Sequence, residues 1–217
     1  MKLGVFVHPK RPKVSKNEIE TILKSHDFHI ADSISDIDIA LVVGGDGTFS
    51  YYGRNLSIPL LFIGVTEPDI LGSKSILAKT TIEDIDKALL CLKKGQYKII
   101  KRNMISVKYN TFEPVDVLTD IYVERGIFAG CIRYTVSVAK NKIKEKEYDE
   151  NNDNDNDNDN DNDNDKNMDF VDFVIGNGVI ISTAFGSTGY YSYPDKMSNT
   201  TKITSELFDD DNLGICH

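Results

Sequence analysis

The sequence has few cysteines, and they form no recognisable pattern. Three of them, Cys91, Cys131 and Cys216, are scattered along 217 residues. An odd and widely spaced set supports neither a disulfide framework nor a cysteine-based metal site. The sequence therefore predicts a reduced, cytoplasmic protein.

Long apolar runs are also missing. No stretch approaches the roughly 18 apolar residues that a membrane-spanning helix needs. Residues 1–8 are apolar over too short a length for a signal peptide, and they lead to Pro9 without a small-residue cleavage site. We therefore interpret the N-terminus as a first buried strand and expect neither a secretory signal nor a membrane span.

A basic patch is the third feature that the sequence lacks. The net charge of −9 comes almost entirely from residues 149–166, whose nine acidic side chains and one lysine account for −8. This Asn/Asp tract cannot bury apolar surface and its charges repel one another, which predicts a disordered loop. Calcium binding is an alternative, although the tract lacks the fixed turn and bidentate glutamate of an EF-hand. The nearly neutral remainder predicts no binding to nucleic acid or to a membrane surface.

The first 96 residues alternate between buried strands and amphipathic helices. Strands are predicted over 2–8, 39–43 and 59–65, and helices over 15–25, 49–56 and 81–94. Ser15 and Glu18 have the spacing of a capping box at the start of the first helix. The pattern predicts a three-layer α/β, Rossmann-like domain over residues 1–96.

After Gly95 the pattern becomes that of a β protein. Strands are predicted over 97–109, 115–124, 132–139 and 170–182, with turn residues between them. The last two predicted strands flank the Asn/Asp tract, which predicts a hairpin with a long tip. We therefore expect a second, mainly β domain over residues 97–217.

A glycine-rich turn follows the central predicted strand. Residues 44–48 have the sequence GGDGT and precede a predicted helix. At the carboxyl edge of a parallel sheet, such a loop lets a phosphate approach the backbone and accept hydrogen bonds from the start of a helix. Asp46 would repel phosphate, so it is a candidate for taking up a proton or holding a metal. An ordinary tight turn is the alternative.

A second polar stretch begins after the Asn/Asp tract. A short buried strand over 179–181 leads to hydroxyl-bearing residues among glycines: Ser182, Thr183, Ser187, Thr188, Tyr190 and Tyr191. Hydroxyls and main-chain N–H groups suit a phosphate or a ribose, and tyrosine can stack on a base. An ordinary Ser/Thr turn is again the alternative.

Together the two stretches resemble the NAD kinase family. The GGDGT loop is shared with diacylglycerol, sphingosine and phosphofructokinase relatives. The sequence STAFGSTGY at residues 182–190 is similar to the TPxGSTxY-type segment of NAD kinases, in a form most similar to archaeal members. The resemblance covers nearly the whole chain. It implies phosphoryl transfer from ATP or polyphosphate to the adenosine 2′-hydroxyl of NAD, which gives NADP.

The resemblance also implies roles for individual residues. Asp46 would accept the proton of that hydroxyl, and Mg²⁺ or another divalent cation would spread the phosphate charge. The residues implied to bind NAD or ATP are Gly44, Gly45, Gly47, Thr48, Thr119, Asp120, Asn177, Thr183, Ser187, Thr188, Gly189, Tyr190 and Ser192. No Walker lysine motif is needed for this chemistry, and none is present. The family resemblance further implies a homodimer or homotetramer.

Several positions differ from the family pattern. Thr119 replaces an asparagine, Asn177 an aspartate and Ala184 a proline, and residues 193–194 replace a run of small residues. Residues 211–217 resemble the start of a strand that further strands follow in the family, so we interpret the second domain as incomplete and the chain as truncated. Two alternatives stay open: a lipid or sugar kinase with the same GGDGT loop, and a catalytically inactive nucleotide-binding homologue.

Overall fold

The computed structural model describes residues 1–10, 12–66, 75–127, 129–139, 168–187, 189, 191 and 213–217. Contacts divide the chain into two compact units, Met1–Tyr122 with Ile180–Cys216, and Val123–Val179 with His217. The Asn/Asp tract at 149–166 lies outside the described residues, so its predicted disorder stays a prediction. The domain boundary proposed near residue 96 also stays a prediction.

A five-stranded parallel sheet forms the centre of the first unit, in the order β2-β1-β3-β4-β5. Its strands are β1 (Lys2–Val7), β2 (His29–Ile30), β3 (Ile39–Gly44), β4 (Leu60–Gly64) and β5 (Thr80–Thr81). The central strand β3 is buried along its whole length. Strands buried on both faces are apolar without interruption, which explains the sequence of β3. Parallel pairing sets Gly44 and Gly64, the last residues of β3 and β4, side by side.

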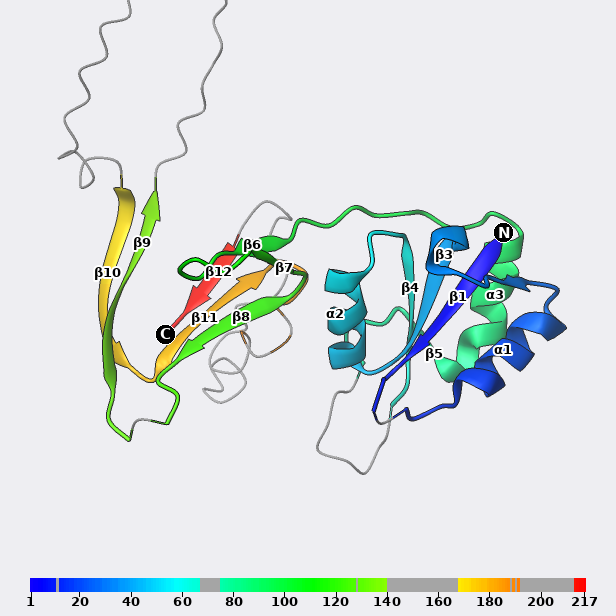
Figure 1. The fold of residues 1–217 in the computed structure, drawn as a ribbon, viewed down its shortest axis with the longest axis horizontal. Coiled ribbons are helices and arrows are strands. Elements are labelled where there is room, and N and C mark those ends of the chain that lie inside the picture. The colour runs from blue at the N-terminus through cyan, green and yellow to red at the C-terminus, as the bar shows by residue number, and fades with distance from the viewer. Residues whose placement is uncertain are drawn as a thin grey trace, which may run out of the picture. The chain divides into compact units, whose positions relative to one another are not determined.

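Helices cover both faces of this sheet (Figure 1). One face carries α1 (Lys16–Ser25) and α3 (Ile85–Lys93), and the other carries α2 (Asp46–Asn55). Two short 3₁₀ helices, η1 (Ile34–Asp36) and η2 (Ile82–Asp84), precede β3 and α3. The predicted three-layer α/β architecture is therefore confirmed. No helix in the described ranges is both long enough and apolar enough to span a membrane.

The capping box at the start of α1 is also confirmed. The N–H of Glu18 donates to the Ser15 hydroxyl at 3.2 Å, and the N–H of Ser15 donates to the Glu18 carboxylate at 2.9 Å. Each side chain thereby satisfies a main-chain donor that the helix itself leaves unpaired.

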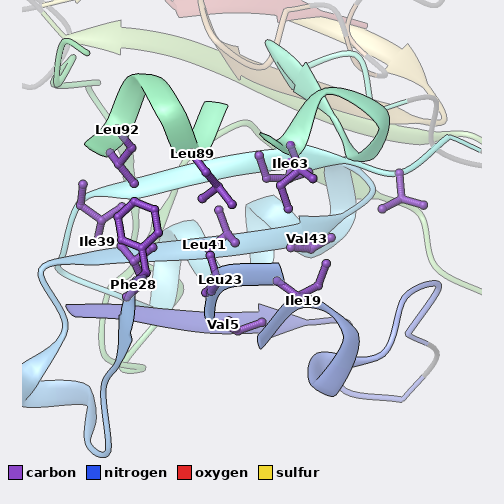
Figure 2. Close-up of a cluster of buried hydrophobic side chains, with 13 residues drawn as sticks. Val5, Ile19, Leu23, Phe28, Ile39, Leu41, Val43, Ile63, Leu89 and Leu92 are labelled. Atoms are coloured by element: carbon purple, nitrogen blue, oxygen red, sulfur yellow. The ribbon is translucent and has the colours of Figure 1, made fainter. Parts of the chain in front are cut away.

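Alternate side chains of the strands build two separate cores. The core beneath α1 and α3 includes Val5, Ile19, Leu23, Phe28, Ile39, Leu41, Val43, Ile63, Leu89 and Leu92, which point toward one another in Figure 2. Val42 points to the opposite face and packs with Phe49 of α2 and Phe62 of β4. Because successive strand residues point to opposite faces of a sheet, the single run of β3 supplies both cores.

The remaining strands form small sheets. β6 (Ile105–Val107) pairs antiparallel with β7 (Val115–Val117). β8 (Asp120–Glu124) neighbours β11 (Gly178–Thr183), which also pairs antiparallel with β12 (Leu213–Cys216). β9 (Ile132–Ala139) and β10 (Met168–Gly176) form an antiparallel hairpin, as predicted for the strands on either side of the tract. The fold class, an α/β part followed by a β part, is therefore confirmed.

Several predicted elements have different limits, and the single strand expected over 170–182 is divided at Asn177 into β10 and β11. The strand expected over 97–109 is reduced to β6, because residues 96–104 join no strand and Ile99 and Ile100 are more than half exposed. The helix expected from residue 81 begins at Ile85, after η2. The strand expected over 115–124 is interrupted at Leu118, which is buried in the core beside α2. Apolar, β-branched sequence does not form a strand unless a neighbouring strand is available to pair with it.

Candidate active site

The GGDGT loop connects β3 to α2, as its sequence predicts. Gly44 ends β3 with a φ of 155°. A Cβ atom on Gly44 would lie 2.8 Å from the Thr48 hydroxyl oxygen and 3.0 Å from the Thr48 Cβ. Only glycine combines ready access to this backbone conformation with so close an approach. Gly44 is therefore required by the packing of buried Thr48 against the end of β3.

The helix α2 begins at Asp46, three residues before the predicted start. Gly45 is its N-cap residue in an extended conformation, and the N–H groups of Thr48 and Phe49 donate to the Gly45 carbonyl at 2.9 and 3.1 Å. A carboxylate in the first turn interacts favourably with the partial positive charge of a helix N-terminus. The charge of Asp46 therefore favours the earlier start.

Gly47 lies on the open side of the first turn of α2. A Cβ atom on Gly47 would meet no described atom within 4 Å. The fold therefore does not need glycine here for packing, in contrast to Gly44. The missing side chain leaves space in which a ligand can approach the backbone of the helix start.

The carboxylate of Asp46 is held by a turn that follows β4. The N–H of Ile76 donates to one carboxylate oxygen at 3.1 Å, and the N–H of Leu77 donates to the other at 3.0 Å. This turn, residues 75–78, is attached to the main chain at the ends of β3 and β4 through the Ser75 hydroxyl. The carboxylate is thereby fixed at the carboxyl edge of the sheet.

Aromatic contacts join the second polar stretch to α2. Phe49 of α2 stacks on Phe62 with ring centroids 4.5 Å apart, and Phe185 meets Phe49 edge-on at 5.9 Å. The Arg102 guanidinium lies over the Phe185 ring, 5.3 Å from its centroid. These contacts bring together two stretches that are distant in sequence.

Thr119 lies between the two polar stretches and makes its polar contacts within the protein. Its hydroxyl is 3.2 Å from the hydroxyl of Ser50 in α2. Its carbonyl accepts hydrogen bonds from the N–H of Thr183 at 2.8 Å and from the Thr183 hydroxyl at 3.1 Å. A Cβ atom on Gly186 would lie 2.5 Å from the Thr119 carbonyl carbon. Thr119 thus connects α2 to the glycine turn of the second stretch.

Asp120 directs its carboxylate toward the same glycine turn. The Tyr122 hydroxyl donates to its Oδ2 atom at 2.8 Å. A Cβ atom on Gly189 would lie 3.4 Å from that oxygen. The side chain is only partly buried, so a carboxylate lies at the surface beside the turn that the sequence predicts to bind ligand.

The hydroxyls of Thr183 and Ser187 are buried and stabilise the turn itself. The Thr183 hydroxyl donates to the Leu118 carbonyl at 2.8 Å and accepts the N–H of Gly186 at 3.0 Å. The Ser187 hydroxyl donates to the Ala184 carbonyl at 2.7 Å. Their direct effect is therefore on the shape of the loop.

Four more residues were predicted to bind NAD or ATP. Thr188, Tyr190 and Ser192 lie outside the described residues. Asn177 belongs to the other compact unit, where it connects β10 to β11 and its carbonyl accepts the N–H of Arg125 at 3.1 Å.

Sequence reasoning missed the turn at residues 75–78 and the packing role of Phe185. Ser75 has a φ of 53°, a conformation that glycine or asparagine usually marks in a sequence. No such residue was there to indicate the turn. Phe185 did carry a signal, since it is a large apolar side chain within a stretch of small and hydroxylated residues.

The tyrosines of α2 add one electrostatic feature. The Tyr52 hydroxyl donates to the Val7 carbonyl at 2.9 Å. Burial raises the pKa of Tyr52, and the neighbouring Tyr51 raises it further. Tyr52 therefore stays neutral over the physiological pH range and acts as a hydrogen-bond donor.

The relatives found by comparison with known proteins are NAD kinases. No family model matches the chain. An NAD kinase of Clostridium beijerinckii is 28% identical over 207 residues, covering 89% of this chain and 60% of that protein. An NAD kinase of Clostridium kluyveri is 30% identical over 162 residues, covering 72% of this chain and 45% of that protein. These relatives are bacterial, so the expected similarity to archaeal members is corrected.

Two solved structures share the fold. An NAD kinase from Archaeoglobus fulgidus in complex with ATP aligns with a TM-score of 0.54 at 18% identity, covering 88% of this chain and 64% of that one. Yeast NADH kinase complexed with NADH aligns with a TM-score of 0.53 at 15% identity, covering 88% and 59%. In the sequence comparison, the chain spans about 60% of the length of the C. beijerinckii relative.

Proposed function

The chain is a relative of the NAD kinases, and from this premise we propose that it transfers a phosphoryl group from ATP to the adenosine 2′-hydroxyl of NAD. One observation carries the proposal. The GGDGT loop and the glycine turn of the second stretch meet in one compact unit, with the Asp46 carboxylate fixed at the start of α2. The curated relatives named NAD kinase support it.

Asp46 is the proposed proton acceptor. Phosphoryl transfer depends mainly on positioning the nucleophile and neutralising charge. The main-chain N–H groups of Ile76 and Leu77 orient the carboxylate, and carboxylate oxygens have capacity for further hydrogen bonds. Asp46 would accept a hydrogen bond from the 2′-hydroxyl and take its proton as the new O–P bond forms. The bond between that phosphorus and ADP breaks in the same transfer.

The start of α2 is the proposed phosphate site. Gly44, Gly45, Gly47 and Thr48 shape a loop at a helix N-terminus, and the space over Gly47 admits a phosphate. Mg²⁺ usually keeps several waters and is held by one or two carboxylates together with substrate phosphates. Within the described residues no group of three or more His, Cys, Asp or Glu side chains could hold a metal. We propose that the cation enters with ATP, or with polyphosphate as an alternative donor.

Asp120 is the proposed contact for an NAD ribose. Its partly exposed carboxylate can accept hydrogen bonds from ribose hydroxyls. The other residues implied by the resemblance stay predicted contacts: Thr119, Asn177, Thr183, Ser187, Thr188, Gly189, Tyr190 and Ser192. We also propose a cytoplasmic location, with which the three free cysteines are consistent, and a homo-oligomer, as the family resemblance implies.

An inactive nucleotide-binding homologue is the second candidate, and Thr119 favours it. The family's asparagine is replaced by a threonine whose hydroxyl lies against Ser50 of α2. A lipid or sugar kinase with the same loop is the third candidate. Tight NAD binding without turnover would identify the second, and phosphorylation of a lipid or sugar the third.

The test is NADP formation by the purified chain with NAD, Mg²⁺ and either ATP or polyphosphate. Asp46→Asn should lower the rate by about 10²- to 10⁴-fold, the range of general base catalysis. Asp36→Asn, which changes an exposed aspartate beside Lys2, is the matched control and should leave the rate unchanged. Equal rates for the wild type and Asp46→Asn would refute the role of Asp46.

A further inference from the structure

We infer that Ser75 is a positioning residue for Asp46 and acts through the two main-chain N–H groups that follow it. This inference rests on the proposed function. Ser75 lies outside both sequence motifs, in the turn at residues 75–78. Its side chain and backbone are fixed by contacts that leave the N–H groups of Ile76 and Leu77 directed at one carboxylate.

The Ser75 hydroxyl anchors the turn to the sheet. Ser75 is 6% exposed, and its hydroxyl lies 3.1 Å from the Gly44 carbonyl and 3.0 Å from the Val65 carbonyl, to which it donates. The N–H of Val65 also donates to the Gly44 carbonyl at 2.9 Å. The hydroxyl therefore links the ends of β3 and β4. Its contact on β3, Gly44, lies only two residues before Asp46 in the sequence.

The turn also fits closely against the sheet. A Cβ atom on Gly64 would lie 2.7 Å from the Ser75 Cβ and 2.8 Å from the Ala78 Cβ. Cβ atoms essentially never approach other heavy atoms so closely, so the position of this turn requires glycine at residue 64. The N–H of Ala78 donates to the Ser75 carbonyl at 3.1 Å, which closes the turn. Leu77 and Ala78 pack against the core beside α2.

The backbone of Ser75 points to a function rather than to packing alone. Its φ of 53° lies in the left-handed region, which non-glycine residues rarely adopt and which persists where surrounding contacts hold it. Here the next two N–H groups both reach Asp46, one to each carboxylate oxygen. Ile76 itself is 52% exposed, so burying that side chain does not explain the conformation.

The test compares Ser75→Ala and Ser75→Gly with Ile85→Val. Ser75→Ala keeps the Cβ and removes the hydroxyl. Ser75→Gly removes both, and glycine adopts the left-handed backbone conformation without steric strain. Ile85→Val removes one methylene from the other core and controls for a general loss of stability. The readouts are kcat and KM for NADP formation and the amide hydrogen exchange of Ile76 and Leu77, measured on the full chain.

Both Ser75 variants should lower kcat by about 10- to 100-fold with KM for NAD unchanged, because a displacement of about 1 Å at a catalytic group costs up to 10²-fold. In both Ser75 variants the Ile76 and Leu77 amides should exchange at least tenfold faster than in the wild type. Asp46→Ala removes the acceptor of these amides and should have the same effect on their exchange. Ile85→Val should change kcat and amide exchange by less than the Ser75 variants do. Unchanged kcat and unchanged exchange in Ser75→Ala would overturn the inference.

Failure of the proposed function gives a different result. A wild-type chain that forms no NADP would refute the proposed activity. Amide exchange would still decide the role of Ser75, since faster exchange in Ser75→Ala supports it and unchanged exchange overturns it.

Discussion

Gly47→Ala should separate the stability of this protein from its ligand binding. At Gly47 the added Cβ would meet no described atom within 4 Å. Alanine is preferred over glycine in a helix by about 0.5–1 kcal/mol, chiefly because alanine loses less backbone conformational freedom on folding than glycine does. Gly47 lies in the first turn of α2, so we expect a gain of about 0.5 kcal/mol at most. For a unit of this size that corresponds to a rise in Tm of about 1–2 °C.

The same methyl group should weaken nucleotide binding. If a phosphate occupies the space over Gly47, the new Cβ must displace it or distort the helix start. Overpacking of this kind typically costs about 1–3 kcal/mol, which is about a 5- to 150-fold loss of affinity. A stabilised protein that binds ATP more weakly would be hard to explain by damage to the fold.

Isothermal titration with MgATP and thermal unfolding would test both halves of this prediction. Gly130→Ala is a suitable control, because a Cβ on Gly130 also meets no described atom within 4 Å and the residue lies in the other unit. That variant should bind MgATP as the wild type does. Wild-type affinity in Gly47→Ala would show that phosphate does not approach the start of α2 and would refute the proposed phosphate site.

Three further predictions concern the surroundings of the site and the first helix. Phe185→Ala should lower the free energy of unfolding by about 1–3 kcal/mol, since it removes a partly buried ring and an aromatic pair; an unchanged urea midpoint would contradict this packing role. Thr119→Val should cost about 1 kcal/mol through loss of the hydrogen bond to α2, and equal stability of the two proteins would show that this bond contributes nothing. The hydrogen bonds from Ser15 lower the pKa of Glu18 from 4.5. The stabilising effect of the ionised Glu18 is therefore fully present above about pH 4.5 and lost as the pH falls through the lowered pKa, so the difference in urea midpoint between wild type and Glu18→Gln should be larger at pH 7 than at pH 3.

The sequence predicted the α/β part well because its signals are local. An unbroken apolar strand, a capping box and a glycine loop each depend on residues that lie close together in the chain, and β3, α1 and the loop at 44–48 follow them. The strand expected over 97–109 was wrong over most of its length for the complementary reason. Whether β-branched sequence forms a strand depends on a partner that local sequence does not specify.

The residue types at the site were predictable, whereas their roles were less so. Thr183 carries a hydroxyl in a polar stretch, and local sequence does not tell a hydroxyl that meets a ligand from one that closes a turn. In the structure the Thr183 hydroxyl is buried and bonded to main-chain groups, so it helps to close the turn, and its contact with a ligand stays a prediction. Ser75 gave no signal at all, because its importance comes from a backbone angle and from contacts with residues 10 and 31 positions away.

The contact between Phe49 and Phe185 has a consequence for how the protein is made. The two rings lie roughly 140 residues apart in sequence, so this contact can form only after most of the chain has left the ribosome. Ribosomes add about 5–20 residues per second, so about 7–28 seconds pass between the synthesis of Phe49 and that of Phe185. The entropy of closing so long a span grows only with the logarithm of its length, and the tract at 149–166 adds about 0.1 kcal/mol to it. Insertions between the two motifs therefore cost little stability, while the nascent chain exposes an unfinished aromatic core throughout that interval.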